Sequence, residues 1–451
     1  MIPDGLFDEV MDWPVTPGAA AAPAEAAAGD RAPAGDPAET GSAGRKRLPG
    51  GGGVYLLTDA EDRPVLLASA ADLRRALAGR LGDVAEAGSP QLPAAPPTET
   101  STPAKSPSPG RRRVDLSRVV GRIRWRAAYS PFELAFEYWR IARVLLPDSY
   151  VENLGFGPCW FLHMDPDAAI PRLRVGRLLQ APPGLDLGPF ATQPDATRFA
   201  EILQDAFDLC RYEHILEQAP HGRACAYFEM GRCPAPCDGS VPMSVYRAAT
   251  AEALAFAAGR RKPWQSRMEA RMRQASAELA FERAAGIRRR LQRAAGVDHP
   301  AFRLVRPVED FNHLVVQRGR GRTRVRPFFV RGGRIQPGPE TSLKDLEPAA
   351  AAWIETMRAP APVAAMDERK DRAWRSEQIW LVSHFLFRPN PGGLFRAAES
   401  LASMHDLVEA VRACFARPSA GPESSGNGAS AGSVPSTDPD RDDPQAAEGP
   451  S

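Results

Sequence analysis

Four of the six cysteines in the chain lie within one short segment, at positions 210, 225, 233 and 237. Thiolates bind soft metals, and four of them suffice to close a tetrahedral zinc site or to hold an iron–sulfur cluster. Two disulfides are the rival interpretation, but the N-terminal sequence has neither the basic start nor the apolar core of a secretory signal, so we expect a reducing cytoplasm. Unliganded thiols in a core are a third interpretation, because buried free cysteine is common. The spacing favours a metal site at Cys210, Cys225, Cys233 and Cys237 without naming the metal.

The sequence around these cysteines carries a family resemblance. The stretch RACAYFEMGRCPAPCDG resembles the cysteine-rich region of the UvrC family, the excinuclease subunit of bacterial nucleotide excision repair. Upstream, LGPFATQPDATRFAEILQDAFDLCR is similar to the Gly-Pro-aromatic turn and the helix that lead to the first cysteine of the family. The resemblance implies a [4Fe-4S] cluster at the four cysteines, with zinc as the alternative.

The predicted fold class is an α+β multidomain protein, and length and composition bound the number of its domains. A chain of 451 residues suggests about two or three domains. Its 45 prolines and 38 glycines concentrate in segments with too little apolar surface to offset chain entropy, which we expect to be disordered. No apolar run reaches the length of a membrane span, so we expect a cytoplasmic protein without a membrane partner. The expected order is a disordered segment (1–47), a small α/β domain (48–150) with a disordered insert (88–112), a β linker (151–187), a cysteine-rich helical region (188–243), a helical region (244–300) with a hairpin (264–295), a small β/α region (301–416) and a disordered tail (417–451).

The first folded region resembles a known nuclease domain. Apolar patterning predicts a strand hairpin over 54–68, a helix over 71–81, a strand over 119–129, and a helix that begins at the capping box Ser130–Glu133. With GVYLLTDAEDRPVLLASAADLRRALAGRL and SPFELAFEYWRIARVLLP, this order resembles the GIY-YIG domain of the UvrC family.

The chemistry of that domain depends on a tyrosine, an arginine and a metal-binding carboxylate. Tyr55 matches the first tyrosine, but the family's second tyrosine, glycine, lysine, arginine and glutamate fall on Leu66, Ala68, Ser69, Ala76 and Tyr138. Arg75 and Glu137 lie one residue away from the last two positions, which on a helix is a rotation of about 100°. We therefore expect a degenerate site. The alternative is a short DNA endonuclease that makes a single incision with Mg or Mn, using Tyr55, Arg75 and Glu137.

Two rows of arginines alternate in strand-like segments and are candidates for DNA binding. Arginines two residues apart suit a phosphate backbone, although a solvated face explains the pattern equally well. The second row lines one face of a hairpin if the strands persist through its glycine turn. The first row comprises Arg122, Arg124 and Arg126, and the second comprises Arg318, Arg320, Arg322, Arg324 and Arg326.

The segment 264–295 is predicted to be a helical hairpin with a bend near Ala280. It resembles the UVR motif, through which UvrC and UvrB contact each other, although Arg289 stands where an aspartate is usual. From Arg260 to Arg293 there are 11 basic and 3 acidic residues, which favours an acidic partner or nearby nucleic acid. The resemblance implies partner contacts with a UvrB-like helicase at Met272, Leu279, Phe281, Glu282, Ala285 and Arg288.

The remaining segments are predicted to be structural. We expect strands over 310–335, helices over 377–387 and 394–415, and a small core that includes Trp380 and Phe385. Cys159 and His163 are interpreted as core residues rather than ligands. No counterpart of the family's ribonuclease-H-like nuclease domain is recognisable. The combined prediction is a UvrC-like excision-repair protein that binds DNA and a UvrB-like partner without cutting; the remaining alternative is a metal- or redox-responsive adaptor outside repair.

Overall fold

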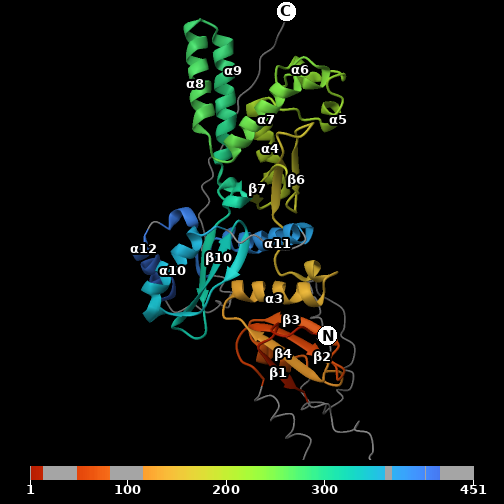
Figure 1. Cartoon of the computed structure of the whole chain (residues 1–451), viewed down its shortest axis with the longest axis vertical. Coiled ribbons are helices and arrows are strands. Elements are labelled where there is room, and N and C mark those ends of the chain that lie inside the picture. Colours follow the sequence, from red (N-terminus) through yellow and green to blue (C-terminus); the bar gives the residue numbers. More distant parts are fainter. Residues whose placement is uncertain (1, 14–47, 82–114, 361–367, 402, 417–451) are drawn as a thin grey trace, which may run out of the picture.

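The computed structural model describes residues 2–13, 48–81, 115–360, 368–401 and 403–416. The predicted insert at 88–112 and the tail at 417–451 therefore lie outside the described residues. Figure 1 shows a sheet of N-terminal strands at one end and a long helical hairpin at the other, with two further sheets between them. Within the described ranges, none of the helices combines the length and apolar composition needed to cross a bilayer.

The N-terminal sheet has the strand order β1-β4-β2-β3, with antiparallel neighbours throughout. Its elements are β1 (Glu9–Asp12), β2 (Gly53–Thr58), β3 (Pro64–Ala70), α2 (Leu73–Ala78), β4 (Arg122–Ala127) and α3 (Pro131–Leu145). The predicted order of two strands, helix, strand and helix is present from β2 to α3. The assignment of 1–47 as disordered is wrong at its start, because β1 pairs with β4. This four-residue edge strand is largely exposed and too short for its apolar pattern to be recognised.

Helix α3 begins where the capping box predicts. Ser130 accepts a hydrogen bond from the Glu133 amide at 3.1 Å, while the Glu133 carboxylate accepts one from the amide of Tyr129 at 2.8 Å. Along one face of the helix, Tyr138 and Ile141 pack toward the N-terminal sheet, as the predicted apolar stripe requires. The opposite face carries buried aromatic side chains into the next core, so α3 belongs to two cores.

The central unit combines a sheet with helices around one core. Strands β5 (Trp160–Met164), β6 (Leu173–Gly176), β7 (Leu185–Phe190) and β8 (Arg306–Pro307) are ordered β6-β5-β7-β8. Leu162 and Leu187 of this sheet share a core with Phe199 and Phe256 of the helices. The expected boundary between 187 and 188 falls inside β7. The helices are α4 (Gln193–Phe207), α5 (Glu213–Leu216), α6 (Ala226–Glu229) and α7 (Met243–Ala257).

A helical hairpin follows, as predicted, and is formed by α8 (Lys262–Ala277) and α9 (Phe281–Ala294). Its base packs into the central core through Trp264, Met268 and Ala294. Between the helices, Leu279 adopts a left-handed conformation with φ 61°. The far end of the hairpin extends away from the rest of the molecule (Figure 1).

The C-terminal sheet has the order β11-β10-β9-β13, and β12 also pairs with β10. Helices α10 and α12 cover one face, and α3 and α11 cover the other. Residues 394–397 form a strand, so the predicted helix over 394–415 is wrong at its start; Leu394 pairs opposite Val316 because β9 offers it a free edge. The elements are β9 (His313–Arg318), β10 (Arg324–Arg331), β11 (Arg334–Pro337), β12 (Thr341–Ser342), α10 (Leu346–Arg358), α11 (Glu368–Leu386), β13 (Leu394–Ala397) and α12 (Met404–Ala416).

His313 makes this sheet sensitive to acid. Its side chain is 3% exposed, and burial lowers its pKa to about 4, with the nearby Arg306 charge acting in the same direction and Glu399 opposing it. The unfolded chain binds this proton near pH 6.5, so the stabilisation is fully present above that pH and is lost as the pH falls toward 4. The loss at pH 4 amounts to about 3 kcal/mol, from about 1.4 kcal/mol for each pH unit between the two values.

We expect His313→Gln to flatten the dependence of the unfolding midpoint on pH between about 6.5 and 4. Denaturant unfolding across this range measures the free energy of unfolding of both proteins at each pH. The contributions of the other titrating groups cancel in the difference between the two proteins. Parallel pH profiles for the two proteins would contradict the assignment.

Candidate functional site

The tip of the α8–α9 hairpin exposes two large apolar side chains. Leu279 is 72% exposed and Phe281 is 65% exposed. Both follow the turn that ends α8, and the left-handed backbone at Leu279 directs the chain back into α9. Of the other predicted contact residues, Glu282, Ala285 and Arg288 are exposed and Met272 is half-buried. Five of the six predicted side chains are therefore accessible on one hairpin.

The base of the hairpin is fixed to the central unit by Arg290. Its guanidinium donates two hydrogen bonds to the carbonyl of Ala206, at 2.8 and 3.1 Å, and pairs with Asp208 at 3.0 Å. Burial raises the pKa of Asp208, while the charge of Arg290 opposes this shift. Because Arg290 ties α9 to the end of α4, the hairpin presents its tip in a defined direction.

The four cysteines of the predicted metal site converge in the irregular region that follows α4. The thiol of Cys233 hydrogen-bonds to that of Cys210, and this bond lowers the pKa of Cys210 while raising that of Cys233. Tyr246 of α7 accepts a hydrogen bond from the Cys210 amide at 3.0 Å, which ties the loop to the core. The charges of Cys225 and Cys237 also act on Cys210.

The donor chemistry suits a thiolate-bound metal, since all four cysteines are free thiols and Cys210 interacts with each of the other three. The side-chain arrangement is less complete: among the described residues, no three His, Cys, Asp or Glu side chains are gathered into a set that could hold a metal ion. Cys237, for example, donates to the carbonyl of Arg223 at 3.8 Å. The structure therefore brings the predicted ligands into one region without closing a ligand sphere around one point.

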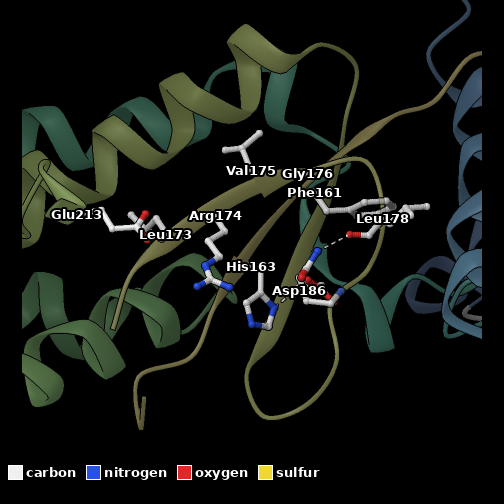
Figure 2. Close-up of a pocket in the computed structure, with 10 residues that line it drawn as sticks. Phe161, His163, Leu173, Arg174, Val175, Gly176, Leu178, Asp186 and Glu213 are labelled. Atoms are coloured by element: carbon white, nitrogen blue, oxygen red, sulfur yellow. Dashed lines mark hydrogen bonds and ion pairs between the residues drawn. The ribbon is translucent and has the colours of Figure 1, made fainter. Parts of the chain in front are cut away.

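Cys159 and His163, which were both predicted to be core residues, lie in different environments. Cys159 is buried, and burial raises the pKa of its thiol, as expected for a core residue. His163 instead lies on the polar face of the central sheet, where its Nδ1 is 3.0 Å from Asp186. Figure 2 shows this pair beside Arg174. The three residues line a hollow of about 460 Å³. The sequence signal for the pair was strand alternation, because β5 places His163 between Arg174 of β6 and Asp186 of β7.

The three candidate catalytic residues of the N-terminal domain do not converge. Tyr55 is 3% exposed and packs with Leu73 and Leu77 on the face covered by α2. Glu137 is 2% exposed and belongs to α3, on the opposite face of the sheet. Arg75 is exposed on α2. An active site needs these groups around one reacting phosphate, and the sheet separates Tyr55 from Glu137.

The first arginine row is neutralised within the protein. Arg124 bonds to Asp62 at 2.8 Å, and Arg126 pairs with the buried Glu137 at 3.0 Å. Arg122 pairs with Asp12 at 3.0 Å, which no pattern near β4 could have revealed. The predicted basic face is therefore matched by carboxylates.

The second arginine row does not share one face of its hairpin. Arg318 pairs opposite Val325, so it points to the other side of the sheet from Arg324 and Arg326. The reason is that residues 319–323 form the connection, so the alternation does not continue from β9 into β10. Arg320 and Arg322 are exposed in this connection.

Comparison with known proteins supports the resemblance seen in the sequence. The family model for the UvrC/Cho excinuclease middle domain matches residues 159–256, which run from β5 to α7. The UvrABC system protein C of Nitrobacter winogradskyi is 32% identical over 164 residues, which is 36% of this chain and 24% of that protein. That of Rhodospirillum rubrum is 31% identical over 174 residues, covering 39% of this chain and 27% of its own length.

The chain thus spans about a quarter of the length of the curated relatives it matches. No solved structure matches it. The matched residues include all four clustered cysteines and the helices on either side of them. Residues 159–256 are therefore similar to the middle domain of the UvrC/Cho excinuclease family, and the relatives with which the chain shares sequence are UvrABC system proteins C.

Proposed function

We propose that this protein acts in nucleotide excision repair by binding DNA and a UvrB-like partner, without cutting DNA at its N-terminal domain. The observation that carries the proposal is the exposure of Leu279 and Phe281 at the end of a hairpin that is otherwise highly charged. Apolar anchors surrounded by charge are typical of the centre of a protein interface. The relatives named above are UvrABC system proteins, which supports a UvrB-like protein as the partner.

DNA binding is supported by the distribution of positive charge. The segment from Arg260 to Arg293 carries 11 basic and 3 acidic residues. Arg320 and Arg322 are exposed in the β9–β10 connection, whereas Arg122 and Arg124 are held by carboxylates. We therefore expect the phosphate contacts at the hairpin and at this connection more than at the first arginine row, on β4.

A metal centre at the four cysteines forms part of the proposal. The contact between Cys210 and Cys233 supplies two sulfurs, and Cys225 and Cys237 stand nearby as the third and fourth ligands. An iron–sulfur cluster or zinc at this position would stabilise a region with only short helices by linking its loops.

The proposed lack of cleavage is tested with a damaged duplex, a UvrB-type partner and either magnesium or manganese. We expect no nicking, because Tyr55 and Glu137 lie on opposite faces of the sheet. Metal-dependent nicking that Glu137→Gln abolishes would instead establish the endonuclease alternative.

Binding to the same duplex should weaken steeply with salt. The double variant Arg320→Gln/Arg322→Gln should reduce the slope of log affinity against log salt by about two. The matched control is Arg122→Gln/Arg124→Gln, which removes the same charge from paired positions and should change the slope less. Equal slopes for the unmodified protein and the first double variant would show that the β9–β10 connection does not contact DNA.

A further inference from the structure

A cavity of about 440 Å³ lies where α3, the β10–β11 hairpin and α11 meet. These elements are far apart in the sequence, and Figure 1 shows α3 and α11 next to the C-terminal sheet. We call it the arginine pocket, because its wall holds four guanidinium groups and two indole rings. They belong to Arg140, Arg143, Arg331, Arg334, Trp139 and Trp374.

Arg143 is held in this pocket by stacking instead of by an ion pair. Its guanidinium carbon lies 4.4 Å from the ring centre of Trp139 and 4.3 Å from that of Trp374. Among the described residues, no carboxylate or carbonyl accepts a hydrogen bond from it, and its buried Nε has no partner. Stacking occupies the two faces of a guanidinium and leaves its N–H edge available for an anion.

The stack itself is fixed by a buried carboxylate. Glu377 of α11 accepts hydrogen bonds from the indole of Trp139 at 2.7 Å and from the hydroxyl of Tyr150 at 2.8 Å. These bonds set the orientation of Trp139 and, through it, that of Arg143. The arginine is therefore positioned before any ligand arrives, which reduces the entropy lost on binding.

The other three arginines are each anchored but retain a free donor. Arg140 bonds to Glu137, Arg331 donates to the Gln336 side chain and to backbone carbonyls, and Arg334 bonds to Asp371. The buried Nη2 of Arg140 and the buried Nε atoms of Arg331 and Arg334 nevertheless have no partner. A buried donor without an acceptor costs about 1–3 kcal/mol, so a ligand that brought acceptor oxygens to the arginines of this wall would relieve part of that cost.

The charge of the wall is strongly one-sided. Of the residues that line the pocket, four are arginines and one, Asp371, is acidic. Burial lowers the pKa of Arg143, and the nearby Glu377 carboxylate opposes this shift only in part, so a further anion at the pocket would favour the charged guanidinium.

We propose that the arginine pocket binds the phosphate group of a nucleotide. A phosphate offers more acceptor oxygens than a carboxylate and matches several guanidinium donors at once. The volume exceeds what a bare phosphate fills and lies in the range of ligand pockets, and Phe136 and Ile335 add apolar surface for a sugar or base. The phosphate belongs either to a free nucleotide or to a strand of single-stranded DNA. Only the second source depends on the DNA-binding function proposed above.

The test titrates the full chain with inorganic phosphate, with dAMP and with an eight-residue oligothymidylate, using calorimetry and thermal unfolding. We expect dAMP or the oligonucleotide to bind and to raise the unfolding temperature, and Arg143→Gln to weaken this binding at least tenfold. The matched control is Arg177→Gln, because Arg177 is stacked on Trp160 at 4.8 Å but lies outside the pocket. It should bind within twofold of the unmodified protein.

The outcomes distinguish a free nucleotide from single-stranded DNA as the source of the phosphate. Binding of dAMP alone identifies a nucleotide site that is independent of DNA, and binding of the oligonucleotide alone identifies a strand site. Arg143→Lys keeps the charge without the planar donors, and it should lose part of the affinity even if Arg143→Gln fails to fold. No thermal shift of the unmodified protein with any of the three ligands, or equal affinity for Arg143→Gln and Arg177→Gln, would overturn the proposal.

Discussion

Phe281→Ala should weaken binding to a UvrB-type helical hairpin by about 30-fold or more, while leaving the unfolding temperature of the protein nearly unchanged. Truncating a central interface aromatic commonly costs upwards of ~2 kcal/mol, which corresponds to that factor. The stability is unaffected because the side chain is 65% exposed in the free protein and contributes little to its core. Calorimetric titration of the full chain with the partner hairpin measures the affinity.

The control for this experiment is Phe228→Ala, which removes the same side chain from another exposed position, in α6. Partner binding by this variant should equal that of the unmodified protein. Unchanged affinity in Phe281→Ala would show that the hairpin is only a structural element. The proposal for the arginine pocket does not depend on this result.

Cys233→Ser should abolish metal binding and lower the unfolding temperature by roughly 6–12 °C, if the centre contributes about 3 kcal/mol to a unit of 150–250 residues. Serine keeps the size of the side chain but is a poor ligand for soft metals. The buried Cys233 contacts Cys210 directly, so its replacement removes one of the two sulfurs that already meet. Anaerobic purification followed by metal analysis and visible absorbance gives the result: a brown protein identifies iron–sulfur and a colourless one zinc.

Cys414→Ser serves as the matched control, because Cys414 is a half-buried free thiol on α12, far along the chain from the cluster. It should retain all the metal. Full metal content in the Cys233→Ser protein would contradict the assignment of the four cysteines as the metal ligands.

Local patterns predicted the elements well and the contacts between them poorly. The Ser130–Glu133 capping box located the start of α3, and the apolar periodicity of 264–295 gave both helices of the hairpin. Strand β13 was missed because its four residues gain their hydrogen bonds only from β9, some 80 residues earlier. Short segments that depend on a distant edge carry too little local signal to be recognised.

Sequence patterns likewise located the arginines but did not predict their interaction partners. Alternation located Arg124 and Arg126 on one face of β4 correctly, but the carboxylates that neutralise them come from a turn and from α3. The sandwich of Arg143 between Trp139 and Trp374 joins residues separated by more than 200 positions. Charge count and periodicity say nothing about such pairings, because tertiary packing alone brings the partners together.

The position of α3 determines whether the chain can be divided into independently folding fragments. Ile141 on one side of the helix fills the N-terminal sheet, and Phe132 and Phe136 on the other side fill the core beneath the C-terminal sheet. A cut anywhere near residue 150 would therefore leave one fragment with an exposed aromatic face and the other with an empty half-core. The two regions do not behave as separable modules, and recombination or truncation at this sequence boundary would yield aggregation-prone pieces.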